Sequence, residues 1–209
     1  LVSMCVSMKT VVNPRTHQHE VVAISGLVYT KLDADVDTVP TGQHMRRFTF
    51  MRPLGSLGPA FPSKFPHDLE PLIKKKNAHK FFETFANERA MLTKFMMKVQ
   101  MEDPDVLASH NLFGFEFDVI LNRCQDLKIA QWDRVGRLKI QKHPRNINDP
   151  SIAGRLFVDT YKAAKEFLRE TTYSLTNLAE TQLKKKRFDV DPIDVPKFYS
   201  NSSDIFQMY

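Results

Sequence analysis

The chain has 209 residues, of which 42% are hydrophobic and 26% are charged, and its formal net charge at pH 7 is +6. This size and composition fit one domain with a real core over residues 1–209, which we expect to be a piece of a longer polypeptide. No apolar run reaches the roughly 18 residues that a membrane span requires. Two isolated cysteines, Cys5 and Cys124, argue against a disulfide framework and a zinc ribbon. The positive charge permits contact with nucleic acid but does not demonstrate it.

The first quarter of the chain has the pattern of β-strands. Residues 1–10 alternate apolar and small polar side chains, as a strand with one buried face does. Residues 20–31 are rich in Val and Ile and predict a second strand, which can pair antiparallel with the first across the turn at residues 13–16. Residues 46–51 predict a third strand.

The clearest helix in the sequence spans residues 87–100. Asn87 can cap its N-terminus by accepting a hydrogen bond from a backbone N–H, and Glu88 suits the positive end of the helix dipole. The apolar side chains of this segment recur on one face, which predicts packing against the core rather than an adaptable binding surface. They are Met91, Leu92, Phe95, Met96 and Val99.

The next stretch, residues 104–116, predicts the functional end of a sheet. Residues 106–108 are apolar and predict a short, fully buried strand, and a turn separates them from a helix that starts at Phe115. A strand that runs through a turn into a helix points polar side chains out of the carboxyl end of the sheet, where ligands of α/β folds usually bind. The two candidate groups there are Asn111 and Glu116.

A basic segment with one aromatic side chain follows and is the best candidate for a surface that faces nucleic acid. Its residues are Trp132, Arg134, Arg137, Lys139, Lys142, His143 and Arg145. The alternative is a surface insertion with ordinary solubilising charge. Residues 154–159 then predict a fifth strand followed by a helix, and Ser174 is a natural N-cap for one further helix.

Three of these segments, in this order, resemble the exonuclease domain of family B DNA polymerases. Residues 111–116, Asn-Leu-Phe-Gly-Phe-Glu, resemble the second exonuclease motif, an Asn followed five residues later by a carboxylate that is usually Asp. Residues 154–159 resemble a Gly-Arg-strand-Asp segment of the family, and residues 173–178 resemble its Tyr-x-Leu step into a helix. The Ser-His-Asn form and the Glu in place of Asp resemble the polymerase alpha branch.

The resemblance also indicates which acidic positions have changed. Active members carry Asp-x-Glu on the first strand, where residues two apart point to the same side, and the alignment places Ser7 and Lys9 there. The third motif of the family is Tyr-x-x-x-Asp. Four residues after Tyr199 stands Ser203, and Asp204 comes one residue too late to share the helix face with that Tyr.

These changes predict a domain without exonuclease chemistry. Hydrolysis with two metal ions needs two cations about 3.5–4 Å apart, held by several carboxylates. Of the family positions only Glu116 keeps a carboxylate, whereas Lys9 adds a positive charge. We therefore expect no catalytic residue and no metal here, and hypothesise that the Lys9 ammonium pairs with Glu116, with Asn111 completing the hydrogen bonds. In the alternative, Lys9 extends into solvent.

The resemblance implies a ribonuclease H-like α/β domain, with a mixed central sheet and helices on both faces, in a replicative polymerase that extends RNA primers with DNA. It further implies no cofactor in this domain, Mg²⁺ in the polymerase domain of the parent chain, DNA and RNA–DNA primer-template as substrates, primase and an accessory polymerase subunit as partners, and the nucleus as location. Two alternatives stay open. One is an active nuclease with a rearranged site of Glu116, Asp118, Asp159 and Asp204, and the other is a nucleic-acid or protein docking module.

Overall fold

The computed structural model describes residues 1–33, 35, 42–138 and 153–207. Its strands are β1 (Ser3–Val12), β2 (His19–Tyr29), β3 (Met45–Met51), β4 (Phe82–Thr84), β5 (Val106–Ser109) and β6 (Leu156–Asp159). Its α-helices are α1 (Leu69–Lys75), α2 (Glu88–Glu102), α3 (Phe117–Asp126), α4 (Thr160–Phe167), α5 (Leu175–Thr181), α6 (Val195–Phe198) and α7 (Ser202–Gln207). Among the described residues, no helix combines the length and the apolar character that crossing a bilayer requires.

The six strands form one mixed sheet in the order β4-β3-β2-β1-β5-β6. β2 pairs antiparallel with both β1 and β3, whereas the β1–β5, β5–β6 and β3–β4 pairs are parallel. This arrangement confirms the predicted mixed sheet and its five predicted strands. The sequence analysis did not predict β4, a strand of three residues at the edge of the sheet.

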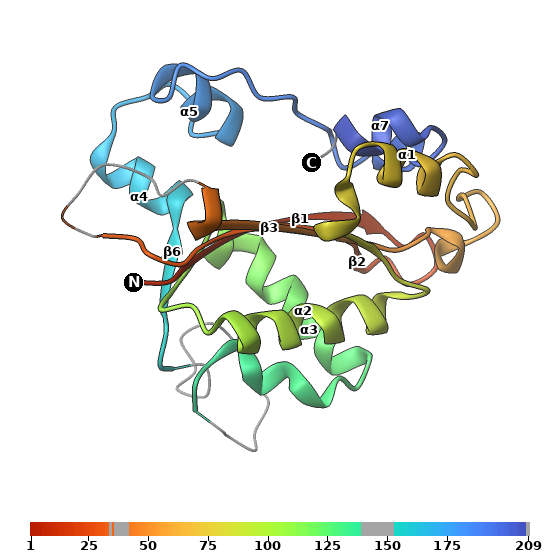
Figure 1. Cartoon of the computed structure of the whole chain (residues 1–209), viewed down its shortest axis with the longest axis horizontal. Coiled ribbons are helices and arrows are strands. Elements are labelled where there is room, and N and C mark those ends of the chain that lie inside the picture. The colour runs from red at the N-terminus through yellow and green to blue at the C-terminus, as the bar shows by residue number, and fades with distance from the viewer. Residues whose placement is uncertain (34, 36–41, 139–152, 208–209) are drawn as a thin grey trace.

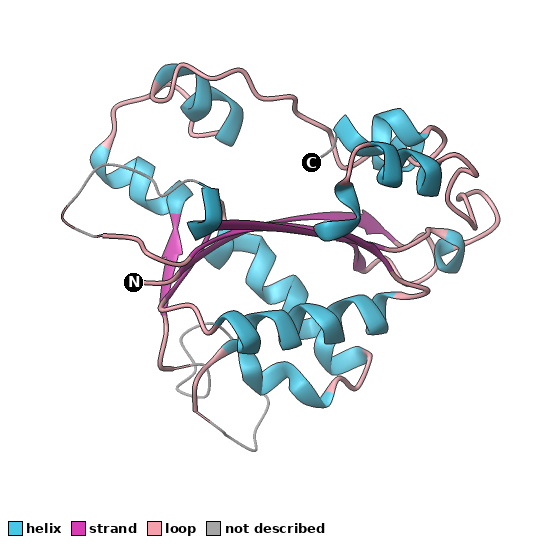
Figure 2. Cartoon of the chain, in the orientation of Figure 1, coloured by secondary structure: helices cyan, strands magenta, loops and turns pink. Residues whose placement is uncertain are grey.

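Helices cover both faces of the sheet (Figure 1). In this view α2 and α3 lie below the sheet, and α1, α4, α5 and α7 lie above it. Figure 2 shows β6 running directly into α4, the strand-to-helix step that the sequence predicted after residues 154–159. The predicted α/β class with helices on both faces is confirmed.

Alternation along β1 decides which side chains reach each face of the sheet. Met4, Val6 and Met8 are buried in the same core cluster as α2 and α3, so Ser7 and Lys9 face the other side. The apolar stripe of α2 is buried in that cluster as predicted, and the Asn87 side chain accepts a hydrogen bond of 2.9 Å from Ala90 N. The cap and the stripe together fix α2 under the sheet.

A β-bulge in β2 places the extra residue Val22 opposite the step from Lys9 to Thr10 of β1, so Val22 has no partner on β1. Bulges bend a strand and free backbone groups for other partners. Here the Val22 carbonyl accepts a hydrogen bond from Arg52 N at 3.1 Å and another from the Tyr199 hydroxyl at 3.1 Å. The bulge therefore joins the centre of the sheet to the C-terminal segment.

Glu88 has a structural role that its place at the start of α2 did not predict. It is buried, and its Oε1 accepts a hydrogen bond of 2.7 Å from Val21 N, next to the bulge. Arg123 of α3 binds the same carboxylate with two nitrogens, Nε at 3.0 Å and Nη2 at 2.6 Å. This paired geometry compensates for the cost of burying both charges and fastens α2 and α3 to β2.

Two details of the segment around β5 differ from the prediction. Residues 106–108 are not fully buried, because alternate residues of β5, Val106 and Ala108, are only half-buried on the face that α2 and α3 do not cover. The helix begins with a π-helical turn, Leu112–Glu116, and its regular part starts at Phe117 rather than Phe115. π-Helical turns often occur at functional sites.

Candidate functional site

A cleft of about 800 Å³ lies over the sheet face opposite α2 and α3. Its floor comes from β1, β2, β3 and β5, and its walls come from the starts of α4 and α5, the segment after α1 and the segment around Arg187. Figure 1 shows α4 and α5 rising at one end of the sheet, with α1 at the other. The carboxyl end of β5 opens into this cleft, where the sequence predicted a site.

Hydroxyl groups form a row across the floor of the cleft. The strand register aligns Ser7 of β1 with Ser25 of β2, and Ser25 with Thr49 of β3, and all three line the cleft. The next row along the strands pairs Cys5 with Leu27 and Leu27 with Arg47. Active members of the family carry a carboxylate at the position of Ser7. Here the floor around Ser7 has hydroxyl groups instead, and the guanidinium of Arg47 lies in the next row.

The Glu116 carboxyl lies beside the part of β1 that extends beyond the end of β5. The pairing of β1 with β5 ends at Cys5 and Ala108, so the Met8 amide has no partner on β5, and it donates instead to Glu116 Oε1 at 3.4 Å. The π-helical turn brings Glu116 back to this point, beside Ser109 at the end of β5.

The contacts of Ser109 favour the protonated form of Glu116. The Ser109 hydroxyl has one hydrogen, yet it lies between the Val6 carbonyl, at 2.7 Å, and the Glu116 carboxyl. A neutral Glu116 that donates to Ser109 Oγ satisfies both contacts, because Ser109 then donates to Val6. Burial, with a smaller contribution from the nearby Asp159 carboxylate, raises the pKa of Glu116 from 4.5 to about 7, although the Met8 amide and the Lys9 ammonium act in the opposite direction.

Lys9 does not pair with Glu116, so that hypothesis is wrong. Its Nζ donates to the Val190 carbonyl at 3.0 Å, and within the described residues no ion pair joins the two side chains. The Lys9 side chain extends to the C-terminal segment around Val190, whereas the Glu116 carboxyl, which lines the cleft, is held by the Met8 amide and Ser109. The alternative that Lys9 extends into solvent does not hold either, because its Nζ binds the Val190 carbonyl and the residue is half-buried. This burial, together with the nearby Arg187, lowers the pKa of Lys9.

Asn111 shapes the turn after β5 and does not complete a Lys9–Glu116 pair. Its backbone is left-handed, with φ of 64°, and its side chain folds back over Gly114, where a Cβ would lie 2.2 Å from Asn111 Oδ1. Asp159 accepts hydrogen bonds from Asn111 N at 3.0 Å, from Phe113 N at 3.0 Å and from Tyr161 N at 2.9 Å. Asp159 thus caps α4 and fixes the turn after β5.

Comparison with known proteins decides the family. The family described as DNA polymerase family B, exonuclease domain, matches residues 2–178 of the chain. The chain belongs to this family. Its relatives include DNA polymerase alpha catalytic subunits from Oryza sativa subsp. japonica (33% identical, covering 100% of this chain and 15% of the relative), Sterkiella nova (37%, 78% and 11%) and Mus musculus (31%, 97% and 14%).

The resemblance to the polymerase alpha branch is confirmed, and the chain corresponds to the exonuclease-like domain of those catalytic subunits. It spans only 15% of the length of the Oryza sativa relative, and 11% and 14% of the other two.

Within this family B domain, the residues that we aligned with the third motif lie away from Glu116. Ser203 is exposed on α7, which lies beside α1 in Figure 1, and neither Ser203 nor Asp204 is among the residues that line the cleft. Tyr199 is buried between Phe65 and the bulge of β2, where its ring stacks on Phe65 at a centroid distance of 5.8 Å.

The first residues of the predicted basic segment lie on the α2 side of the sheet, away from the cleft, and the others fall outside the described residues. Trp132 and Arg134 lie in the 3₁₀ segment η5 (Ala130–Val135), which packs beside α2, and Arg137 forms ion pairs with Asp103 and Asp105. The cations Lys139, Lys142 and Arg145, together with His143, fall outside the described residues.

The cleft has cationic side chains that the sequence analysis did not select. They are Arg47, Lys76 and Arg187, and His110 also lines the cleft. The sequence could have predicted Arg47, because it lies two residues before Thr49 on a predicted strand and therefore on the same face of the sheet. Lys76 and Arg187 come from connecting segments far apart in sequence, and no local pattern brings them together.

Proposed function

We propose that this domain retains an exonuclease fold without exonuclease chemistry. The observation that carries the proposal is the lining of the cleft, where Glu116 is the sole carboxylate among the described residues and Arg47, Lys76 and Arg187 are present. Two divalent cations about 4 Å apart need several carboxylates to hold them and to offset their charge. One carboxyl group cannot supply this, least of all one whose pKa burial raises to about 7.

The remaining family positions fit the metal pair no better. Ser7 offers a neutral hydroxyl, which is a weak ligand for Mg²⁺. The Lys9 ammonium is bonded to Val190 on the cleft side of β1, where it would repel a divalent ion. Ser203 lies on α7, outside the lining of the cleft.

A rearranged active site is less well supported. Asp159 is buried, and its two oxygens already accept three backbone N–H groups. Asp118 is exposed on the first turn of α3, and Asp204 lies on α7. These carboxylates do not line the cleft with Glu116, so they offer no shared site for a cation.

For the whole polypeptide we infer a DNA-directed DNA polymerase of nuclear DNA replication, which extends RNA primers with DNA. Its similarity to DNA polymerase alpha catalytic subunits supports this inference. Its substrates are then DNA and RNA–DNA primer-template, with Mg²⁺ in the polymerase domain. Primase and an accessory polymerase subunit are its partners in this proposal.

A second candidate function is binding of a nucleic-acid strand in the cleft without cleavage. The three cations Arg47, Lys76 and Arg187 surround a floor of hydroxyl groups that can donate hydrogen bonds to phosphate oxygens. Such binding would weaken steeply with added salt, because phosphate contacts release counterions. A titration with labelled oligothymidylate at two salt concentrations tests it.

Incubation of the chain with a 5′-labelled single strand and millimolar Mg²⁺ or Mn²⁺ tests the absence of exonuclease activity. We expect no metal-dependent shortening of the strand, and the same result for Glu116→Gln. The variant is a matched control, because Gln keeps the size and the hydrogen bonds of Glu116 while removing its charge. Shortening by the unmodified chain that Glu116→Gln abolishes would overturn the proposal.

A further inference from the structure

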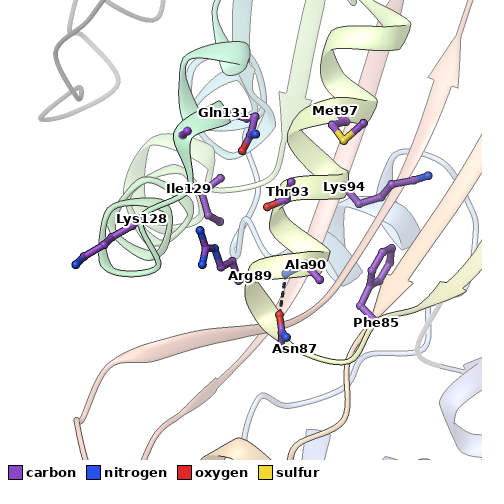
Figure 3. Close-up of a pocket in the computed structure, with 11 residues that line it drawn as sticks. Phe85, Asn87, Arg89, Ala90, Thr93, Lys94, Met97, Lys128, Ile129 and Gln131 are labelled. Carbon is purple, nitrogen blue, oxygen red and sulfur yellow. Dashed lines mark hydrogen bonds between the residues drawn. The ribbon is translucent and has the colours of Figure 1, made fainter.

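A second cavity, of about 640 Å³, lies on the other side of the sheet, against α2 (Figure 3). Its floor on the helix consists of Ala90, Thr93 and Met97, whose spacing of three and four residues places them on one face. Ile129 and Gln131 face this floor from the segment after α3. The pocket is therefore separate from the cleft around Glu116, and no exonuclease motif contributes to it.

The floor of this pocket is largely apolar and open to solvent. The opposite stripe of α2 is buried under the sheet, so the side that carries Ala90 and Met97 is the outward one. Met97 is 43% exposed, although burying a methionine side chain in a protein interior is favourable by about 1.5–3 kcal/mol. An apolar side chain of a partner would gain contacts here that water cannot provide.

Three cations surround the floor, and no acidic side chain lines the pocket among the described residues. Figure 3 shows Arg89 and Lys128 on the side of the pocket near Ile129, and Lys94 on the opposite side of α2. The side chains of Arg89 and Lys128 make no ion pair or hydrogen bond within the described part of the chain.

The third cation, Lys94, forms a weak surface ion pair and can change its partner. Its Nζ lies 3.5 Å from Glu83 Oε2, and both side chains are at least 40% exposed. An exposed pair of this kind contributes little to stability, so a better-placed carboxylate can replace Glu83. The pocket thus has an apolar centre with positive charge on two sides.

We propose that this pocket docks a short acidic peptide segment of a partner protein, which inserts one apolar side chain over Thr93 and Met97. Carboxylates before and after that side chain reach Arg89 and Lys128 on one side and Lys94 on the other. The volume lies within the usual range of ligand clefts, about 300–1,000 Å³, and one apolar anchor with flanking charges is a common way to combine affinity with orientation.

The same features argue against a nucleic-acid strand at this position. Single strands bind through aromatic side chains on which bases stack, together with cations that follow the backbone. Here the floor is made of Ala90, Thr93 and Met97, and one aromatic side chain, Phe85, stands at the edge among the described residues. An acidic peptide uses both the charge and the apolar floor, whereas a phosphate backbone uses the charge alone.

Fluorescence anisotropy with a labelled heptapeptide tests the proposal, with one Phe between two runs of three acidic residues as the probe. We expect saturable binding to the chain, and an affinity about tenfold lower for the double variant Arg89→Glu, Lys128→Glu. The matched control is Lys162→Glu, Lys165→Glu on α4, which reverses two exposed charges away from the pocket and should change the affinity less than about twofold. Melting temperatures of both variants check that they fold.

A second comparison tests the role of the apolar side chain of the peptide. Replacing the Phe of the peptide by Ser should lower the affinity about tenfold, and Thr93→Arg, which fills the pocket while adding positive charge, should lower it as well. Equal binding of the Ser peptide would mean unspecific attraction and would overturn the proposal. So would displacement of the peptide by equimolar oligothymidylate, or loss of binding when the complete polymerase polypeptide replaces this chain.

Discussion

Replacing Glu116 by Gln should stabilise the chain at alkaline pH and leave its stability at acidic pH unchanged. Gln is neutral and has nearly the shape of protonated Glu. Its amide can donate to Ser109 Oγ and accept from Met8 N, so both contacts of the neutral carboxyl survive. The variant therefore removes one property of Glu116, its ability to ionise in a buried position.

The magnitude follows from the pKa of Glu116. Burial raises it from the ordinary 4.5 to about 7, and this difference corresponds to about 3 kcal/mol of stability at 1.36 kcal/mol for each pKa unit. Between these two pH values the folded chain holds a proton that the unfolded chain has lost, so stability falls as the pH rises. The contribution is fully present below pH 4.5 and is lost as the pH rises through 7. Because the cleft admits some water, we expect Glu116→Gln to be more stable than the parent by about 2 kcal/mol at pH 8.

Urea unfolding at pH 5, 6, 7 and 8 measures this difference, with Asp118→Asn as the matched control. Asp118 is exposed two residues along the same segment, so removing its charge should change stability by less than about 0.5 kcal/mol at every pH. A difference between Glu116→Gln and the parent that does not grow from pH 5 to pH 8 would refute the assignment of a protonated Glu116. So would a variant that is less stable than the parent at pH 8.

Three further predictions concern the neighbourhood of the cleft and the core. Millimolar Mn²⁺ should leave the melting temperature unchanged, because an ion without a site in the folded state cannot stabilise it, and a saturable upward shift would contradict this. Arg123→Met should cost about 3–5 kcal/mol in urea unfolding, since it leaves Glu88 buried without its partner, while the exposed Arg89→Met should cost less than about 0.5 kcal/mol. Lys9→Met should cost only about 1 kcal/mol, the value of one hydrogen bond to Val190, and a double-mutant cycle with Glu116→Gln should give a coupling energy below about 0.5 kcal/mol.

The sequence was sufficient for the elements whose periodicity is local. Alternation along residues 1–10 and the stripe from Met91 to Val99 depend on neighbours in sequence, and both the strand and the helix are present. The turn after β5 and the position of Glu116 beside that turn could also be predicted, because the resemblance to the family covers those residues. β4 could not be predicted, because a strand of three residues is too short to show an alternating pattern of apolar and polar side chains.

The partners of the predicted side chains could not be obtained in the same way. Lys9 was expected to meet Glu116, yet its partner Val190 is 181 residues further along the chain. Glu88 at a helix start is consistent with a dipole interaction, and nothing local indicates that Arg123, 35 residues later, makes it a buried pair. Side-chain direction at a sheet edge depends on which backbone groups lack partners, and that is a property of the assembled sheet.

The bulge of β2 sets a condition on how the chain reaches its folded state during synthesis. The Tyr199 hydroxyl that binds the Val22 carbonyl is synthesised 177 residues after it. Contacts of such long range form slowly, because the loop must close before the bond can stabilise it. While the ribosome is still making the segment before Tyr199, the face of the sheet near the bulge lacks the apolar cover that Tyr199 and Ile205 provide. A nascent chain that is released before that point would expose Val22 and Met51, both of which belong to the same core cluster as Tyr199.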